Sequence, residues 1–495
     1  MPVRQPRLLC AVSAFLLLAA APAFAISIKL TPTFDHPGAK IDVSGKGFGA
    51  DAVIDIYFDA TEELVVTANA RGKFRKHPFQ IPAGASPGEH WVTAVERNDG
   101  RGAQRPFLVS ASWVEHGYDP RGMRSNPYET VLSTANVDRL SKLWVAQTGC
   151  YIESSPAVVD GVVYIGSESD CGLFALDAGT GALLWNASTG GNLESTPAVA
   201  NGAVYIGSGD GKLYAFDAKT GAPIWTVQTG NSIASSPAVS GGVVYVGSED
   251  HNVYAVDAAS GAVLWATATG NLVESSPAVA GGKVYVGSED GLLYALDAAT
   301  GAVLWKGVTF NGILSSPAVA DGAVYVGSGD FNLYAFDANT GATLWSANTG
   351  SYVLSSPAVA NGVVYIGNDA GRLFAYDART GALVWRVVQT GNLIRSSPAV
   401  ANGVVYVGSA DGNIYAFDAV TSAQLWSAQS GVIDDSSPTV SDGAIYIGSL
   451  DQHIYAFALD GGDHAAYRHG HTNPPSYASL HPNLRLKPES VGRNP

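Results

Sequence analysis

Short apolar segments recur along this 495-residue chain with a fixed period. From Trp144 onward a tryptophan returns every 40 or 41 residues, and each unit contains four apolar segments separated by turn residues, as in residues 235–265. Each segment has the length of a strand. Four strands in about 40 residues, repeated in series, are typical of the blades of a β-propeller. The recurring tryptophans are Trp144, Trp185, Trp225, Trp265, Trp305, Trp345, Trp385 and Trp426.

The first two segments of each unit are joined by a pair of turn residues. Such pairs favour a type I′ hairpin, because both central residues take a positive φ angle. We therefore expect the first two strands of every blade to form a tight hairpin. The pairs are Asp160-Gly161, Asn201-Gly202, Gly241-Gly242, Gly281-Gly282, Asp321-Gly322, Asn361-Gly362, Asn402-Gly403 and Asp442-Gly443.

The number of blades follows from the number of segments. The Val-Tyr-x-Gly segment occurs eight times, first around Tyr164 and last around Tyr446. The tryptophan segment also occurs eight times, but Trp144 precedes the first unit and no such segment follows Ala458. We therefore expect the strand around Trp144 to complete the last blade and close the ring. The predicted fold class is all-β, an eight-bladed β-propeller preceded by a small β-sandwich.

The link between the third and fourth segments carries a family signature. Residues 175–185 follow the pattern Ala-x-Asp-x-x-x-Gly-x-x-x-Trp, which resembles the tryptophan-docking motif of pyrroloquinoline-quinone-type (quinoprotein-type) propellers. The pattern recurs in five further units; the next has Ser422 in place of the glycine, and the last unit lacks it. Residues 113–140 resemble the lead-in segment of these propellers. The resemblance implies the fold but no single function, since quinoprotein dehydrogenases and non-catalytic scaffolds share it.

The dehydrogenases of this family, as the resemblance implies, hold the quinone between a tryptophan and a ring of adjacent cysteines, with Ca²⁺ and a catalytic aspartate. Eight of the ten tryptophans here belong to the repeat, Trp91 lies in the N-terminal region, and only Trp113 has no assigned role. Adjacent cysteines and a Cys-x-x-Cys-His haem motif are absent from the sequence. We therefore predict no catalytic residue, no metal site and no cofactor. A pyrroloquinoline-quinone- and Ca-dependent alcohol or sugar dehydrogenase remains the alternative.

Residues 26–111 predict a separate domain of short strands divided by Pro-Gly and Arg-Gly turns. Six or seven strands in about 85 residues suit an antiparallel sandwich. Residues 37–48 resemble the opening of bacterial immunoglobulin-like modules, which implies a spacer or adhesion role. The expected strands include Ile41–Val43, Val53–Phe58, Leu64–Thr67, Phe79–Ile81, Trp91–Val95 and Phe107–Val109.

The first 25 residues have the three parts of a secretory signal peptide. Arg4 and Arg7 precede an apolar run, and Ala23-Phe24-Ala25 fits the cleavage site. We expect cleavage after Ala25 and a periplasmic or secreted protein; lipidation at Cys10 is the weaker alternative, because it lies at the start of the apolar run. No later stretch has about 20 uninterrupted apolar residues, so we expect no membrane span. The predicted division is 1–25 signal peptide, 26–111 immunoglobulin-like sandwich, 112–141 lead-in segment, 142–460 propeller and 461–495 C-terminal tail.

Charge is distributed unevenly between the predicted domains. The formal net charge is −15, and it becomes −17 once the two arginines of the leader are removed. The acidic and basic residues of 26–111 balance, so the whole excess falls on residues 112–495. Such a chain does not suit nucleic acid, whose phosphates need a basic face. Aspartates in the turns of the repeat account for most of the excess, since aspartate accepts hydrogen bonds from backbone N–H groups there.

The repeat also permits a comparison of the blades at one position, the residue before each Ser-Ser/Thr-Pro. This position begins the innermost strand at one mouth of the channel. Blades 8, 1 and 2 are neighbours in the ring, so Asp435, Glu153 and Glu194 are expected along one arc, with Asp434 close by and Glu274 and Arg395 further round. Crowded carboxylates raise one another's pKa unless a cation or basic group is bound. The eight residues are Glu153, Glu194, Ala234, Glu274, Leu314, Leu354, Arg395 and Asp435.

Two interpretations of this acidic arc stay open. It is either a site for a cation, a basic peptide or a hydroxyl-rich ligand, or a solvated rim around a water-filled channel. Further side chains on the same face could add stacking or hydrogen bonds to such a site: Tyr151, His251, Phe331, Tyr352, Arg372 and His453.

Two cysteines remain in the mature chain, Cys150 and Cys171, on opposite sides of the Asp160-Gly161 turn and equally far from it. We predict a disulfide between them, which the exported setting permits. The tail contains His464, His469, His471 and His481, and we interpret it as a surface-bound strap rather than a metal site.

Taken together, these features predict an exported, monomeric, non-catalytic binding or scaffolding protein. Its ligand-binding residues would be Glu153, Glu194, Glu274, Arg395, Asp434 and Asp435 at the channel mouth. The partner would be an envelope or extracellular protein or a small ligand. An outer-membrane assembly scaffold is a further alternative, weakened by the absence of a lipid-anchor signal.

Overall fold

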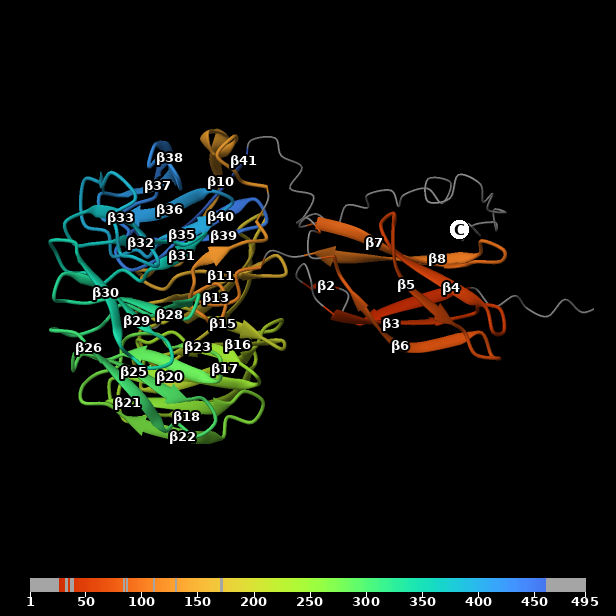
Figure 1. The fold of residues 1–495 in the computed structure, drawn as a ribbon, viewed down its shortest axis with the longest axis horizontal. Helices are drawn as coiled ribbons and strands as arrows, with labels where there is room; N and C mark the ends of the chain where they lie inside the picture. The colour runs from red at the N-terminus through yellow and green to blue at the C-terminus, as the bar shows by residue number, and fades with distance from the viewer. Residues whose placement is uncertain are drawn as a thin grey trace, which may run out of the picture.

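The computed structural model describes residues 26–31, 34–35, 40–82, 85, 88–109, 112–129, 131–169 and 172–459. The predicted leader and tail lie outside these ranges. Figure 1 shows the strands of the described residues in two groups, a sandwich and a ring of blades. The single helix among them is the short 3₁₀ turn η1 (Val137–Arg139). None of the described helical residues forms a segment long and apolar enough to cross a membrane.

The first eight strands form the sandwich. One sheet has the order β1-β3-β6 and the other β2-β8-β7-β4-β5. Apolar side chains of both sheets meet in one core, for example Val43 and Phe74 of the first sheet with Ile56 and Phe107 of the second. The strands are β1 (Ser27–Thr31), β2 (Phe34–Asp35), β3 (Lys40–Lys46), β4 (Val53–Phe58), β5 (Thr61–Thr67), β6 (Lys73–Gln80), β7 (Gly88–Glu96) and β8 (Gly102–Val109).

Eight further sheets form the propeller, and each contains four strands of the repeat. Blade 1 contains β11 (Ala157–Val159), β12 (Val162–Ser167), β13 (Gly172–Asp177) and β14 (Leu183–Ala187); blade 2 β15 (Ala198–Ala200), β16 (Ala203–Gly207), β17 (Lys212–Asp217) and β18 (Pro223–Gln228); blade 3 β19 (Ala238–Ser240), β20 (Val243–Ser248), β21 (Asn252–Asp257) and β22 (Val263–Ala268); blade 4 β23 (Ala278–Ala280), β24 (Lys283–Gly287), β25 (Leu292–Asp297) and β26 (Val303–Val308). Blade 5 contains β27 (Ala318–Ala320), β28 (Ala323–Gly327), β29 (Asn332–Asp337) and β30 (Thr343–Asn348); blade 6 β31 (Ala358–Ala360), β32 (Val363–Gly367), β33 (Arg372–Asp377) and β34 (Val388–Gln389); blade 7 β35 (Ala399–Ala401), β36 (Val404–Ser409), β37 (Asn413–Asp418) and β38 (Gln424–Gln429), with β9 (Ser125–Asn126) added beside β35. Blade 8 contains β39 (Thr439–Ser441), β40 (Ala444–Gly448), β41 (His453–Leu459) and β10 (Leu140–Gln147).

The hairpins between the first two strands form as predicted, since both residues of all eight turn pairs have positive φ angles. The hydrophobic cores lie between neighbouring blades. For example, Tyr164 and Leu173 of blade 1 pack with Val204 and Ile206 of blade 2. A blade therefore buries its apolar faces only when the next blade is present.

The ring closes as the segment count predicts. Strand β10, from the start of the repeat, pairs antiparallel with β41 from its end, and Trp144 lies opposite Ala456. Blade 8 thus combines the two ends of the repeat, and the eight-bladed all-β fold is confirmed.

Each tryptophan of the repeat docks onto the next blade. The indole N–H of Trp225 donates to the carbonyl of Ala258 at 3.1 Å, and the hydroxyl of Tyr205 donates to the same oxygen at 3.1 Å. A Cβ atom at Gly261, in the turn of that next blade, would lie 2.9 Å from the Trp225 ring. Glycine is needed there both for this approach and for its φ of +74°. The Trp and Gly of the motif therefore join neighbouring blades, whereas the Asp holds the turn within its own blade, as Asp257 does by accepting from Ser260.

The disulfide between Cys150 and Cys171 stays a prediction. Cys150 is described in the structure, but Cys171 lies outside the described residues. A bridge would close a loop of about 20 residues and stabilise the fold by roughly 3 kcal/mol in the chain-entropy account. We expect mass spectrometry of the non-reduced mature protein to find no alkylated cysteine. Two alkylated thiols would contradict the prediction.

Candidate functional site

The lead-in segment closes one end of the propeller channel. The innermost strand of a blade has one edge without a neighbouring strand, so its backbone groups need other partners. Residues 113–126 supply these partners, one for each of the first seven blades. In every case a valine N–H of the innermost strand is the donor, and in blade 3 the acceptor is the Glu115 carboxylate instead of a backbone carbonyl. The donor and acceptor pairs are Val158 to Trp113, Val199 to Val114, Val239 to Glu115, Val279 to Pro120, Val319 to Arg121, Val359 to Met123 and Val400 to Arg124. In blade 8 the Asn126 amide donates to the carbonyl of Val440.

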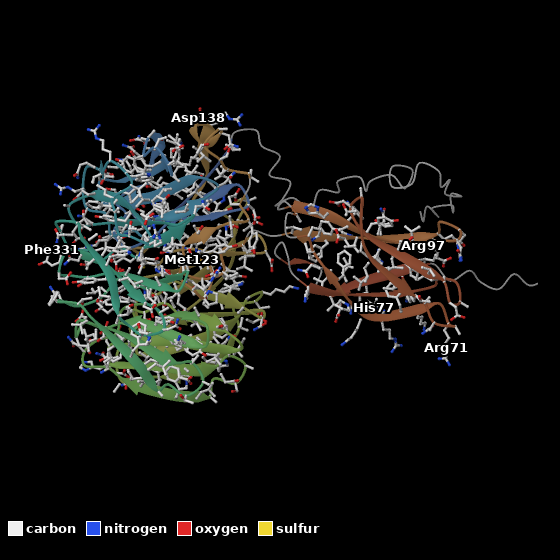
Figure 2. All side chains as sticks on the ribbon, viewed as in Figure 1. Arg71, His77, Arg97, Met123, Asp138 and Phe331 are labelled. Carbon is white, nitrogen blue, oxygen red and sulfur yellow. The ribbon has the colours of Figure 1, made fainter. Side chains whose placement is uncertain are left out.

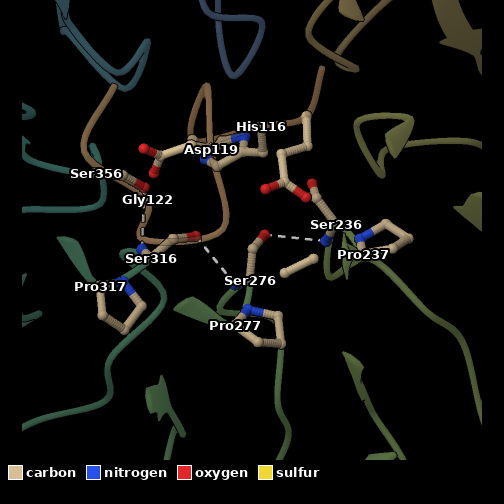
Figure 3. A pocket seen from close by; sticks show the side chains of 13 residues that line it. His116, Asp119, Gly122, Ser236, Pro237, Ser276, Pro277, Ser316, Pro317 and Ser356 are labelled. Atoms are coloured by element: carbon tan, nitrogen blue, oxygen red, sulfur yellow. Dashed lines mark hydrogen bonds between the residues drawn. The ribbon is translucent and has the colours of Figure 1, made fainter. Parts of the chain in front are cut away.

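A belt of hydroxyl groups lies next along the channel. The second residue of each Ser-Ser/Thr-Pro accepts a hydrogen bond from the backbone N–H of the same position in the preceding blade, and the bond from Ser437 to Ser155, 2.9 Å long, completes the circle. Figure 3 shows four members of this belt, Ser236, Ser276, Ser316 and Ser356. The motif therefore has a structural role in holding the innermost strands together.

Two buried titratable groups of the lead-in segment, Glu115 and His116, lie beside this belt. Burial raises the pKa of Glu115 to about 8, and burial next to Arg124 lowers the pKa of His116 to about 3. Oε1 of Glu115 and Nε2 of His116 have no partner among the described residues. The cavity beside them measures about 10 Å³, room for about one water molecule (Figure 3). Both shifts favour the uncharged form of the side chain.

The opposite mouth of the channel is acidic. In blade 1, Glu153 begins the innermost segment, and Ser154, Ser155 and Val158 follow it toward the closed end. At about 3.3 Å per residue, this mouth lies about 15 Å from the lead-in segment. Oxygen atoms of Glu153, Asp434 and Asp435 lie within 4.8 Å of one another. The structure thus brings together two of the three residues that we expected on one arc, with Asp434 beside them.

A second position of the repeat lines the same mouth, and four of its eight residues are carboxylates that were not expected there: Glu168, Glu249, Glu289 and Asp369. The residue after each Gly-Ser donates its backbone N–H to the loop that precedes the innermost strand, as Glu168 does to the Tyr151 carbonyl at 3.0 Å. Comparison of the blades at this position would have found the set, because its members vary as the first set does. The eight residues are Glu168, Gly209, Glu249, Glu289, Gly329, Asp369, Ala410 and Leu450.

The pKa shifts follow from this crowding. Partial burial, then repulsion from Glu168 and Asp435, raises the pKa of Glu153 to about 8. Burial and repulsion from Glu289 and Glu249 raise the pKa of Glu274 to about 7. The pKa of Glu194 is also raised, by burial and then by Glu168 and Glu249.

Asp435 is accessible to water but surrounded by protein on most sides. Burial and Asp434 raise its pKa to about 6, although Arg395 opposes the shift.

Arg395 is closer to the arc than expected. Its guanidinium lies 3.4 Å from the carboxylate of Asp369 and 3.5 Å from that of Asp434. Blade 7 is the other neighbour of blade 8, so Arg395 reaches the arc from the opposite side to Glu153. Glu274 lies further round, yet repulsion from Glu194 and Asp435 contributes to its raised pKa.

Beside the carboxylates, the mouth contains a hollow of about 410 Å³. Leu314, Tyr352 and Leu354 of blades 5 and 6 supply its apolar wall. Glu289, Asp369 and Arg395 supply charge at its margin. The site therefore combines an acidic arc over blades 8 and 1–4 with an apolar hollow at blades 5 and 6.

Because the pKa of Glu153 is raised, we expect the free energy of unfolding to depend on pH. Its ordinary pKa is 4.5, so between pH 4.5 and 8 the folded protein binds more protons than the unfolded chain. The free energy of unfolding must therefore fall as the pH rises through this window. We expect Glu153→Gln to raise the free energy of unfolding at pH 8 by about 1 kcal/mol, a value reduced for access of water. At pH 5 the change should be smaller.

Urea unfolding of both proteins at pH 5 and pH 8 measures this difference. Glu63→Gln, in the sandwich, removes an equal charge away from the mouth and is the matched control. A Glu153→Gln variant that is less stable than the parent at pH 8 would contradict the prediction.

The fold defines the class of the larger domain, an eight-bladed β-propeller. A family described as the β-propeller of the β-alanine-activating enzyme matches residues 148–362. The sequence has no significant match among curated proteins.

Solved structures resemble the fold over more of the chain. A europium-containing methanol dehydrogenase has a TM-score of 0.62 at 16% identity, over 70% of this chain and 98% of the other. The quinohemoprotein alcohol dehydrogenase of Comamonas testosteroni has a TM-score of 0.62 at 18% identity, over 71% and 81%. BamB from Moraxella catarrhalis has a TM-score of 0.56 at 23% identity, over 67% and 99%. At these identities the likeness concerns the fold alone.

Proposed function

We propose that this protein is an exported, non-catalytic binding and scaffolding module that takes a positively charged ligand or partner segment at the channel mouth. The observation that carries the proposal is the convergence of carboxylates from blades 8, 1, 2, 3 and 4, with raised pKa values at four of them. A bound cation would relieve this repulsion and let the carboxyl groups ionise. The closed far end makes the channel a blind site rather than a passage.

The residues at the mouth do not fit pyrroloquinoline quinone. The quinone carries three carboxylates, which nearby carboxylates of the protein would repel. The described residues of this mouth include the Arg395 guanidinium and nine carboxylates. The nine are Glu153, Glu168, Glu194, Glu249, Glu274, Glu289, Asp369, Asp434 and Asp435. Trp113, which had no assigned role, is buried in the lead-in segment and packs on Tyr118 and Arg124. The charge and the tryptophan positions thus favour binding of a cation over quinone chemistry.

The predicted signal peptide supports a protein that works outside the cytoplasm. We infer that the N-terminal sandwich is an immunoglobulin-like spacer, and that it presents the propeller to its partner as part of a monomer.

Binding of a fluorescently labelled octalysine to the mature protein, measured by anisotropy at low ionic strength, tests the proposal. Wild type should bind with an affinity that decreases as salt is added. A variant with Glu153→Gln, Glu194→Gln and Asp435→Asn should bind at least tenfold more weakly. Asp51→Asn, Glu63→Gln and Asp138→Asn together make a matched control, because they remove the same charge from exposed positions elsewhere. Equal affinity in the two triple variants would contradict a site at the mouth.

The dehydrogenase alternative has its own experiment. Purified protein is mixed with pyrroloquinoline quinone and Ca²⁺, and both quinone binding and dye-linked oxidation of alcohols and sugars are measured. We expect neither. Saturable quinone binding in the micromolar range would overturn the proposal in favour of the enzyme.

A further inference from the structure

Blade 5 differs from the other blades at the surface of the mouth. Phe310 is 86% exposed, the most exposed large apolar side chain among the described residues. Phe331 and Tyr352 are also exposed, and their rings meet edge to face at 4.9 Å between centroids. Figure 2 shows Phe331 at the edge of the propeller.

The repeat shows that the fold does not require these phenylalanines. In the seven other blades the position of Phe310 is a glycine, namely Gly149, Gly190, Gly230, Gly270, Gly350, Gly391 and Gly431. At the position of Phe331, glycine stands in blades 2, 4, 6 and 7.

Phe331 also has a strained backbone. Its φ is +77°, a conformation that is an outlier for a bulky residue and costs free energy that glycine would avoid. The ring packs on Tyr352, and the residue keeps 38% of its surface exposed to water. A strained, exposed aromatic residue beside a hollow therefore suggests a role in binding.

A hydrogen bond joins the segments that carry the two phenylalanines, and both segments border the hollow. The N–H of Phe310 donates to the carboxylate of Asp330, the residue before Phe331, at 2.8 Å. The hollow includes Asn311 and Gly312, which directly follow Phe310, and the ring of Tyr352 lines it. The aromatic patch, Phe310, Phe331 and Tyr352, thus borders the apolar wall made by Leu314 and Leu354.

We propose that the aromatic patch and the hollow form the docking site of a polypeptide segment that combines lysine or arginine with an apolar side chain. This rests on the proposed function and specifies the partner. The apolar side chain would enter the hollow, whose volume suits one or two side chains. The basic side chains would lie against the carboxylates of blades 8 and 1–4 and over the aromatic rings, since a cation is attracted to the face of an aromatic ring.

Charge complementarity favours a basic polypeptide over a membrane surface, the other large partner that exposed phenylalanines could fit. The carboxylates of the mouth would repel the anionic headgroups of bacterial lipids. The arc spans five blades, which is longer than a small cation needs and suits several positive charges along a chain.

A library of random dodecapeptides displayed on phage, selected on the mature wild-type protein, tests the proposal. Enriched peptides should combine lysine or arginine with leucine or an aromatic residue. A synthetic copy of the most enriched peptide should bind at least tenfold more weakly to a Phe310→Gly, Phe331→Gly variant. Both substitutions install the residue that other blades already carry, so the variant should fold, with an unfolding midpoint equal to or above that of wild type.

Val420→Ala provides the control, because it removes an apolar side chain that is 80% exposed in a turn between the outer strands of blade 7. Its affinity for the peptide should equal that of wild type. Enrichment of neutral or acidic peptides, or equal binding to the double phenylalanine variant, would overturn the docking site. So would binding of the protein to phosphatidylglycerol vesicles that is lost in that variant.

The outcome is distinguishable from failure of the proposed function. If octalysine binds and depends on the carboxylates but selected peptides ignore the phenylalanines, only the docking inference fails. If no basic peptide binds and the carboxylate variants behave as wild type, both fail.

Discussion

Replacing Arg124 with alanine is expected to lower the free energy of unfolding by about 3–5 kcal/mol. The side chain is 1% exposed, and its guanidinium donates to three backbone carbonyls, those of His116, Pro398 and Pro438. These come from the lead-in segment and from blades 7 and 8. Each carbonyl left without a partner in the interior costs about 1–3 kcal/mol, and the lost side chain leaves a cavity.

Urea unfolding at pH 7 measures the effect. Arg139→Ala is the matched control, because Arg139 is exposed at the end of η1, and its loss should change the free energy of unfolding by less than about 0.5 kcal/mol. A change below 1 kcal/mol for Arg124→Ala would show that the lead-in segment contributes little to holding the ring.

Replacing Trp144 with alanine should cost a comparable amount, about 3–5 kcal/mol. Trp144 is 8% exposed, its indole N–H donates to the Ala178 carbonyl at 2.8 Å, and its ring fills the space against Gly181. The substitution removes this packing at the junction where the ends of the repeat meet. The Ala178 carbonyl keeps one donor, the hydroxyl of Tyr446 at 3.2 Å, so the loss is mainly one of packing.

Two variants separate these contributions. Trp144→Phe keeps most of the ring volume but loses the indole N–H, so it should cost about 1 kcal/mol. Trp225→Ala removes the same docking contact between blades 2 and 3, where the ring is less buried, and should cost less than Trp144→Ala. Equal losses in all three variants would contradict a special role of packing at the closure.

The candidate site could be predicted only in part. The comparison of blades singled out Glu153, Glu194 and Asp435, because variation at one position of a repeat is visible in the sequence. Arg395 was expected further round, but it belongs to blade 7, which is the neighbour of blade 8 on the side away from blade 1. Glu168 and its equivalents in the other blades were not predicted. They lie near Glu153 and its equivalents only because the end of the second strand packs beside the loop that precedes the innermost strand.

The sequence by itself determined the blade, the number of blades and the closure of the ring. Period, turn pairs and docking tryptophans are local signals, and each reports on contacts within one unit or with the next. Only the tertiary structure decided what the channel contains. The lead-in segment satisfies the inner edges of eight strands that lie up to about 280 residues apart, and nine carboxylates from six blades meet at one mouth. No local pattern encodes these meetings, because they follow from bending eight units into one closed circle.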